Sequence, residues 1–492
     1  MGITAFSFIV LPLCLLWAFN PLRLFQLLFV AGVFEAAAAI TLGGLGVQPG
    51  LVPALALIGY VMLQLALGAQ YPGQRRALRL CGPLLLVGAW AIAASMLLPH
   101  LFRDQVYVWP QKSTPPFRIA LLEPSASNIN QDLYLVVNLL LLSLGAMILT
   151  KSDAIRVGAF KAYLISGFVA FAVAVWQLLS KVAHLPYPDA LFYSNPGWSI
   201  LTGQSMGAIP RINGSFAEPS SLGSYMAACT CCAGWLILCG HRQALLKPLF
   251  VTGIAGVLMS TSTTGIASLA IAAGGLALGG LMSGSTRMLR KLLRFGVPLL
   301  VGVGVLGAVA LVLAPGAYDV LGQIFSATLN KQSSASYDER TSTDLDNLQA
   351  ALDTWGLGVG WGSSRSSSLI PGLLAGIGVP GMVGLLIFGV RLGRQVGAAK
   401  RRGCTPGQHF VMDGSAAALV GYLIPACLSA PTISSVSFFA LLALLVGACA
   451  AAGSAVAQPG WVWYEGSDEA EALLPDGASE AAARNEATPI SD

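Results

Sequence analysis

The chain has 492 residues, of which 55% are hydrophobic and 10% are charged, and its formal net charge is +5. With a mean hydropathy of +0.72, this composition cannot be reconciled with a surface covered by water, so it excludes an ordinary soluble globular protein. The basic residues lie mainly in short segments between apolar runs, so the positive charge reports membrane topology and gives no indication of a nucleic-acid partner.

Apolar runs of about 20 residues recur along the whole chain, which is the length needed to cross roughly 30 Å of hydrocarbon as a helix. They predict an all-α polytopic integral membrane protein with about 13 transmembrane helices, in a range of roughly 12 to 14. The predicted spans are residues 5–19, 24–42, 51–69, 81–99, 133–150, 160–183, 221–239, 247–260, 264–282, 296–314, 371–390, 410–429 and 434–452. The stretch 247–282 is interrupted by Ser-Thr-Ser-Thr-Thr at 260–264, so it is read either as two short helices or as one broken helix.

The distribution of Lys and Arg predicts the orientation, because loops rich in these residues stay in the cytoplasm. With the first residues outside, the inner loops hold 18 of the 27 basic residues and the longer outer loops hold eight. Residues 1–452 therefore form a predicted membrane domain whose three long loops, at about 100–132, 184–220 and 315–370, face outward. Residues 453–492 carry eight acidic residues against one Arg and predict a disordered cytoplasmic tail, either regulatory or merely solvated.

The densest polar motif, at residues 211–223, ends the second outer loop. It places Arg211 and Glu218 at the mouth of a helix bundle that otherwise contains few charges. A guanidinium group can bind phosphate oxygens in a fork, and a carboxylate can accept the proton of a sugar hydroxyl. The alternative interpretation is structural: Glu218 pairs with Arg211, or it lies at the positive end of a helix that begins at Pro219.

In the third outer loop, Ser342 is predicted to cap a short helix on the membrane surface that ends at Trp355 and has Arg340 at its start. Its apolar side consists of Leu345, Leu348 and Leu352. The sequence Asp344-Leu-Asp346 resembles the metal-binding Asp-x-Asp of nucleotide-sugar transferases. Carboxylates in the first turn of a helix are a sufficient explanation, so no metal site is predicted.

Four motifs in this order resemble the O-antigen polymerase and ligase superfamily of bacterial inner membranes. They are the 211–223 motif, Ser260-x-Ser262-x-x-Gly265, Arg340 followed by Gly358-x-Gly360, and Gly378-x-x-Gly381-x-x-Gly384. The resemblance covers about residues 130–450. It implies a multi-span fold of the glycosyltransferase C type that acts on undecaprenyl-diphosphate-linked glycans at the periplasmic face.

The chain departs from the ligase pattern at two places. Ser367 and Ser368 stand where ligases typically carry a His followed by Asn, Ser or Gln, and Thr263 stands where an Arg often follows the second Ser of the break motif. These departures favour a polymerase of O-antigen, capsular polysaccharide or exopolysaccharide. An O-antigen ligase, a protein O-oligosaccharyltransferase and a flippase or transporter of lipid-linked sugars remain the alternatives.

The predicted reaction displaces a lipid diphosphate from an anomeric carbon, so negative charge grows on the leaving phosphate. Because arginines can stabilise that charge, we predict a metal-independent glycosyltransferase without a cofactor. Besides the lipid-linked glycan and membrane lipid, a chain-length regulator and a flippase are candidate partners. The predicted catalytic residues are Arg211, Glu218 and Arg340, and the predicted substrate-binding residues are Asn213, Ser220, Tyr337 and Arg365.

Three other residues are weaker candidates for proton transfer. Glu35 lies inside the second predicted span, where an ionisable group is a functional hypothesis by default. His100 and His184 lie at outer membrane boundaries, where they could serve as a substitute base or, more simply, as interfacial anchors.

Overall fold

The structure is a computed structural model that describes residues 2–42, 45–111, 119–198, 200–206, 209–282, 290, 293–294, 335–429 and 434–453. The described residues belong to one unit, residues 1–454, and the second unit, Ala455–Asp492, lies outside them. The predicted acidic tail, except for its first residue Gly453, therefore lies outside the described residues, as does the predicted span 296–314.

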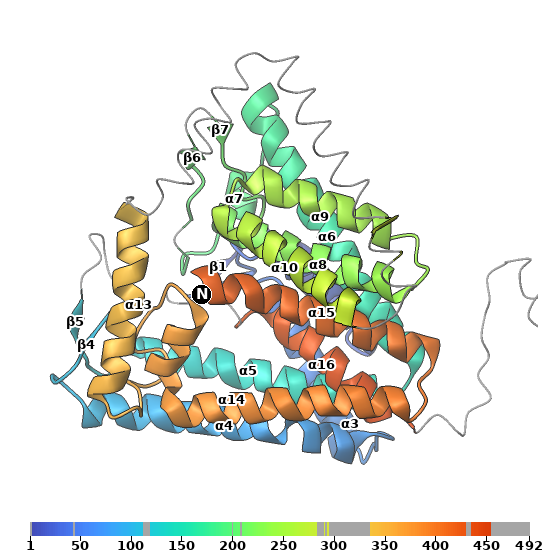
Figure 1. The fold of residues 1–492 in the computed structure, drawn as a ribbon, viewed down its shortest axis with the longest axis horizontal. Helices are drawn as coiled ribbons and strands as arrows, with labels where there is room; N and C mark the ends of the chain where they lie inside the picture. Colours follow the sequence, from blue (N-terminus) through green and yellow to red (C-terminus); the bar gives the residue numbers. More distant parts are fainter. Residues whose placement is uncertain are drawn as a thin grey trace, which may run out of the picture. The chain divides into compact units, whose positions relative to one another are not determined.

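The described residues are mostly helical (Figure 1). Within this described part of the chain, seven helices are long and apolar enough to cross a membrane: α4 (Gln74–Leu101), α5 (Ala126–Leu149), α6 (Asp153–Ala183), α8 (Pro219–Cys239), α10 (Thr263–Met282), α14 (Leu369–Arg401) and α15 (Pro406–Ser429). Five shorter apolar helices accompany them: α1 (Ser7–Leu16), α2 (Pro21–Ala31), α3 (Leu51–Ala66), α9 (Leu246–Ser260) and α16 (Val436–Ala451). The prediction of a helical membrane protein is confirmed in these coarse terms.

The second predicted span, residues 24–42, is wrong in its C-terminal half, because α2 ends at Ala31. In the backbone that follows α2, side chains from distant segments supply hydrogen-bond partners to Ala38 and Ala39. The hydroxyls of Thr4 and Ser7 donate to the carbonyls of Ala38 and Ala39, and the Ala38 amide donates to Ser194 Oγ at 3.1 Å. Glu35 therefore lies in the connection after α2 and outside any helix.

Short antiparallel strands, which the sequence did not indicate, join segments of the loops. The first sheet has the order β1-β2-β3, and the other two are the pairs β4-β5 and β6-β7. Their bounds are Gly2–Ile3, Ile40–Leu42, Leu45–Val47, Tyr107–Val108, Ala120–Leu121, Ser205–Met206 and Ile209–Pro210. The pair β6-β7, with Met206 opposite Ile209, leads directly into Arg211.

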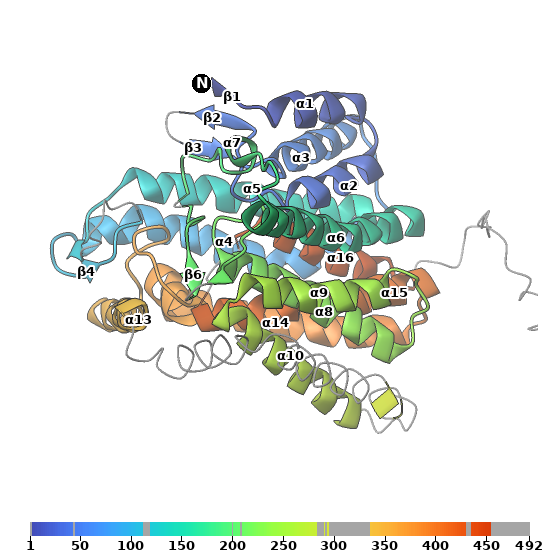
Figure 2. The ribbon, with the colours of Figure 1, turned by 90° about the horizontal axis from the view of Figure 1, so that it is seen from above.

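The core surrounds α16, whose residues are buried along its whole length. It packs against α5, α15 and α4, while α8 packs against α9, α10 and α15. Small residues permit these close approaches, since a Cβ at Gly421 of α15 would lie 2.7 Å from the Cα of Ala228 in α8. Figure 2 shows α8, α9 and α15 side by side.

The 247–282 stretch forms two helices, which resolves the alternative that the sequence left open. After α9 ends at Ser260, Thr261 has a left-handed backbone with φ of 46°, and α10 begins at Thr263. The hydroxyls of Ser260 and Ser262 accept hydrogen bonds from the amides of Ser262 and Gly265. The break in the chain is therefore stabilised by its own serines.

The loop helix α13 (Ala335–Asp353) begins earlier than predicted. Ser342 is not its cap, since the Ser342 hydroxyl donates to the Glu339 carbonyl three residues earlier, inside the helix. The predicted end is confirmed, because Trp355 has a φ of 52° and Gly356 has a φ of 77°. The helix α13 runs crosswise to α4, α5 and α14 (Figure 1), and Leu345 and Leu352 on its predicted apolar side are exposed.

Two glycine motifs meet where α13 joins α14. Gly378 interrupts α14 with a φ of 63° and a ψ of −172°, a backbone conformation that is almost restricted to glycine. The Val379 amide donates to the Gly356 carbonyl at 2.8 Å, and the Val359 amide donates to the Ala375 carbonyl at 2.7 Å. The turn after α13 is thus fixed to the kink of α14.

Replacing Gly378 with Ala should lower the stability of the protein by about 2 kcal/mol or more. The alanine would have to adopt a strained backbone conformation, and its Cβ would lie 2.3 Å from the Leu357 carbonyl oxygen. Thermal unfolding in detergent measures the change. Gly389→Ala in the same helix is the matched control, since a Cβ there has nothing within 4 Å, and it should leave the midpoint unchanged or raise it slightly. Equal midpoints for the two variants would contradict this account of the kink.

Candidate functional site

The candidate site lies at one end of the helix bundle, which we call the loop end. It contains the starts of α8, α10 and α14, the end of α15, and α13. Contacts between distant segments define it: Asn128 at the start of α5 donates to the Trp361 carbonyl at 2.8 Å, and the Arg365 amide donates to the Trp109 carbonyl at 2.7 Å. Segments of the first and third long predicted loops therefore meet at the loop end, and the second loop contributes Arg211, which lies near Arg340.

Arg211 follows β7 and is half-buried. Its Nη1 donates to Gln204 Oε1 at 2.9 Å, while its Nε is buried without a hydrogen-bond partner among the described residues. Burial lowers the pKa of this guanidinium, nearby Glu218 raises it, and nearby Arg340 lowers it. An arginine remains protonated despite such shifts, so a half-buried positive charge with an unused Nε donor lies near both other predicted catalytic residues.

Arg340 extends from α13 toward the end of α15 and the start of α10. Its Nη1 donates to Ser429 Oγ at 2.6 Å, and that hydroxyl lies 2.8 Å from Thr264 Oγ1. Because Thr264 is in the first turn of α10, the guanidinium of Arg340 lies beside the positive end of a helix. The N-terminal end of α10 follows the 260–262 break, so the fold brings this predicted motif close to Arg340.

Glu218 directly precedes α8, which begins at Pro219 as the sequence predicted. One carboxylate oxygen accepts a hydrogen bond from Ser220 Oγ at 2.9 Å. Within the described part of the chain, Glu218 makes no direct ion pair with Arg211 and no side-chain cap of α8. Its carboxylate is therefore held near Arg211 without a direct ion pair between the two side chains.

Of the predicted substrate-binding residues, Asn213 has a structural role here. Its side chain has no exposed surface, and its amide group accepts from Gln177 Nε2 at 2.8 Å and donates to the Phe216 carbonyl at 2.7 Å. Asn213 thus attaches the loop that contains Arg211 to Gln177 of α6. Ser220 is also buried and orients Glu218, whereas Tyr337 is exposed on α13, one turn before Arg340.

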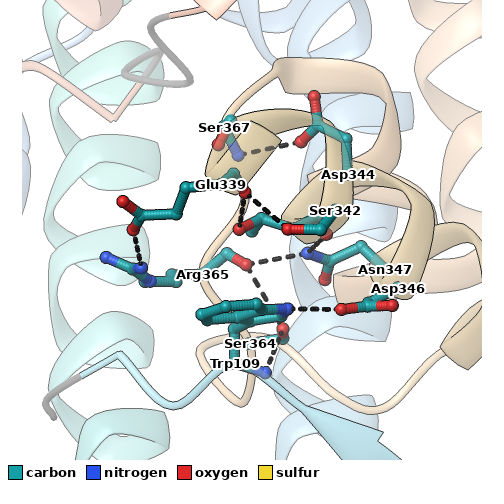
Figure 3. Close-up of polar contacts among 10 residues, drawn as sticks. Trp109, Glu339, Ser342, Asp344, Asp346, Asn347, Ser364, Arg365 and Ser367 are labelled. Carbon is teal, nitrogen blue, oxygen red and sulfur yellow. Dashed lines mark hydrogen bonds and ion pairs between the residues drawn. The ribbon is translucent and has the colours of Figure 1, made fainter. Parts of the chain in front are cut away.

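Arg365 is held beside α13 by several contacts (Figure 3). Its Nη2 lies 2.7 Å from Glu339 Oε1, and its guanidinium lies over the Trp109 ring at 5.3 Å from the ring centre. Asn347 Nδ2 donates to the Arg365 carbonyl at 2.8 Å. These contacts fix the position of Arg365 between α13 and Trp109.

The two carboxylates of the Asp-x-Asp sequence have different hydrogen-bond partners in Figure 3. Asp344 accepts from the amides of Ser367 and Ser368 before α14, at 2.9 and 3.1 Å. Asp346 accepts from Trp109 Nε1 at 2.9 Å. Both aspartates lie inside α13 and join it to neighbouring segments, so the prediction that they occupy a first helical turn is wrong, because α13 begins at Ala335.

Glu35 is a second carboxylate near the site, although it was not among the predicted catalytic residues. It lines a cavity of about 50 Å³ together with Ser221 and Tyr225 of α8 and Tyr422 of α15, which leaves room for a few water molecules. Burial, together with the smaller effect of nearby Glu218, raises the pKa of Glu35 to about 7. In the sequence, Glu35 stands out as an isolated acid within an apolar stretch. Its proximity to Glu218 arises only from the fold.

Stability should fall as the pH rises through about 7, because the raised pKa means that the fold favours protonated Glu35. This contribution to stability is complete below the usual pKa of a glutamate, about 4.3, and is lost as the folded protein releases the proton. Thermal unfolding between pH 5 and 8.5 should show the decline. Glu35→Gln should reduce it and be the more stable form above pH 7, while identical profiles for parent and variant would contradict the assignment.

The arrangement combines two arginines and a helix N-terminus, which suit an anion, with two carboxylates that can hold or accept a proton. Within the described residues, no group of three His, Cys, Asp or Glu side chains is placed to hold a metal ion. No protein-family model matches the chain, and no curated protein matches it significantly.

Proposed function

We propose that the chain polymerises undecaprenyl-diphosphate-linked oligosaccharide repeat units into O-antigen, capsular polysaccharide or exopolysaccharide. The observation that carries the proposal is the electrostatic proximity of Glu218 and of Arg340 to Arg211 at the loop end. Arg211 and Glu218 belong to the second long loop and Arg340 to the third, so the fold brings charged residues of two loops together. The proposal includes about 13 spans in a glycosyltransferase C-type fold and places the loop end at the periplasmic face of the bacterial inner membrane.

In the proposed reaction, a sugar hydroxyl of one repeat unit attacks the anomeric carbon of another. The new glycosidic bond forms as the bond from that carbon to the diphosphate oxygen breaks, and the lipid diphosphate leaves. Arg211 and Arg340 stabilise the charge on the leaving diphosphate. Glu218 accepts the proton of the attacking hydroxyl, or orients that hydroxyl while Glu35 accepts the proton.

Deleting the protein from its host and separating the cell-surface polysaccharide by gel electrophoresis tests this function. The proposal expects loss of long chains while the product with a single repeat unit remains. Loss of all transferred glycan would instead indicate a ligase. Accumulation of repeat units that face the cytoplasm would indicate a flippase, and either result would overturn the proposal.

The proposed orientation predicts that the loop end is accessible from outside the cell. A cysteine at Glu123, which is exposed before α5, should react with a membrane-impermeant thiol reagent in intact spheroplasts. A cysteine at Gln243, exposed between α8 and α9, should react only after lysis. The parent protein, with its exposed Cys239 and Cys427, supplies the background, and the reverse labelling pattern would place the site in the cytoplasm.

A further inference from the structure

A second cationic site lies at the other end of the bundle, far along α4 and α14 from the loop end. A cavity of about 520 Å³ is lined there by four arginines, Arg76, Arg79, Arg391 and Arg402. Its remaining lining residues are Leu80, Gln395, Cys449, Ala450 and Gly453, so no carboxylate is among the described residues that line it. The volume is in the range of sites that bind small ligands.

The four guanidinium groups come from segments that are distant in the sequence. Arg76 and Arg79 are in the first two turns of α4, Arg391 is in α14, and Arg402 directly follows α14. Since α4 and α14 pack against each other, the fold brings these like charges together. Such convergence raises the local positive potential and favours an anion in the cavity.

Most of these arginines have donors available for a ligand. Arg76 Nη1 donates to the Ala452 carbonyl at 3.1 Å and so links α4 to the end of α16. In contrast, Arg79, Arg391 and Arg402 are exposed and make no side-chain hydrogen bond or ion pair with the described part of the chain. Guanidinium groups pair best with phosphate oxygens, which they can bind in a fork.

Apolar side chains continue from the arginines along the same helix faces. On α4, Leu86 lies two helical turns beyond Arg79, and on α14, Ile387 and Val383 lie one and two turns before Arg391. All three of these apolar side chains are exposed. Because α4 and α14 are long and apolar enough to span a membrane, a spanning orientation would place the cavity near the level of the lipid phosphates.

We propose that the four-arginine cavity binds the phosphate headgroup of an anionic phospholipid, whose acyl chains lie along the exposed apolar side chains of α4 and α14. The shared chemistry is that of any phosphate ester, but the adjoining apolar faces favour a lipid over a soluble phosphate compound. The site is separate from Arg211 and Arg340, so the proposal does not depend on the proposed reaction.

Native mass spectrometry of the purified full chain tests the site with phosphatidylglycerol and with phosphatidylcholine of the same acyl chains. The parent should retain phosphatidylglycerol preferentially. The pair Arg79→Gln and Arg391→Gln should weaken its binding by about tenfold or more, since each basic residue near lipid phosphates contributes roughly 1 kcal/mol. The matched control is the pair Arg75→Gln and Arg394→Gln, which removes two arginines from the same helices outside the cavity lining and should retain the parent's binding.

Size-exclusion chromatography checks the fold of each variant. Arg402→Gln changes a residue that follows α14 and should also weaken the binding of phosphatidylglycerol. Equal losses in the cavity and control pairs, or equal retention of the two lipids by the parent, would overturn the proposal. Glycerol 3-phosphate serves as a headgroup without chains. If it binds as tightly as phosphatidylglycerol and depends on Arg79 and Arg391, the ligand is a soluble phosphate compound and the lipid assignment is wrong.

Discussion

Replacing Arg211 or Arg340 with Lys should lower the rate of polymer formation by about 10- to 100-fold at limiting substrate. Lysine keeps the charge but loses the planar fork that binds two phosphate oxygens. A hydrogen bond between charged groups contributes roughly 1.5–3 kcal/mol, which corresponds to this range of rates. The measurement is the initial rate of polymerisation by purified protein supplied with lipid-linked repeat units.

Arg103→Lys is the matched control, because Arg103 is an exposed arginine near the end of α4 that pairs only with its neighbour Asp104 among the described residues. This variant should keep the parent's rate. If Arg211→Lys and Arg340→Lys also keep that rate, the two guanidinium groups do not contact phosphate through a fork, and their role is at most to supply charge.

Replacing Glu218 with Gln should lower the rate by about 10² to 10⁴, the usual effect of losing a general base. Glutamine preserves the size of the side chain and can still accept the hydrogen bond from Ser220, but it cannot accept the proton. Rate and substrate affinity should be measured together, since loss of a base lowers the rate while substrate binding remains.

Ser220→Ala separates the two roles of this region, because it removes the hydrogen bond to Glu218 and leaves the carboxylate. Its rate should fall much less than that of Glu218→Gln. If Glu218→Gln is nearly as active as the parent, Glu218 has a structural role. Glu35 is then the next candidate for the base, ahead of the exposed His184 at the end of α6, and Glu35→Gln should show the large loss instead.

Helix positions were the part of the fold that the sequence predicted best, because long apolar runs and capping residues act locally. The start of α8 at Pro219 follows from a residue suited to the first helical turn. The break between α9 and α10 follows from hydroxyl side chains that bond to nearby backbone amides. Twelve predicted spans overlap described helices, while the number of spans remains a prediction.

Tertiary contacts decided the features that the sequence could not reveal. The helix α2 stops at Ala31 because Thr4, Ser7 and Ser194 supply hydrogen bonds to the backbone that follows. The two aspartates of α13 bond to residues more than 20 positions away in the sequence.

The same distinction applies to the candidate site. Residue chemistry was enough to select Arg211, Glu218 and Arg340, since charges are rare in this chain. Their proximity depends on how α13 packs against α14 and reaches the end of α15 through Ser429. The inclusion of Glu35 depends on a cavity formed by three segments that are far apart in the sequence, which no local pattern could indicate.

The central claim is tested most directly by incubating the purified protein with undecaprenyl-diphosphate-linked repeat units in lipid vesicles that contain EDTA. The account predicts a ladder of products that grow by one repeat unit at a time, with one lipid diphosphate released for each bond formed, and this activity should be lost when both Arg211 and Arg340 are replaced with Ala. An intact donor with no ladder, or a ladder that the double variant still produces, would contradict it.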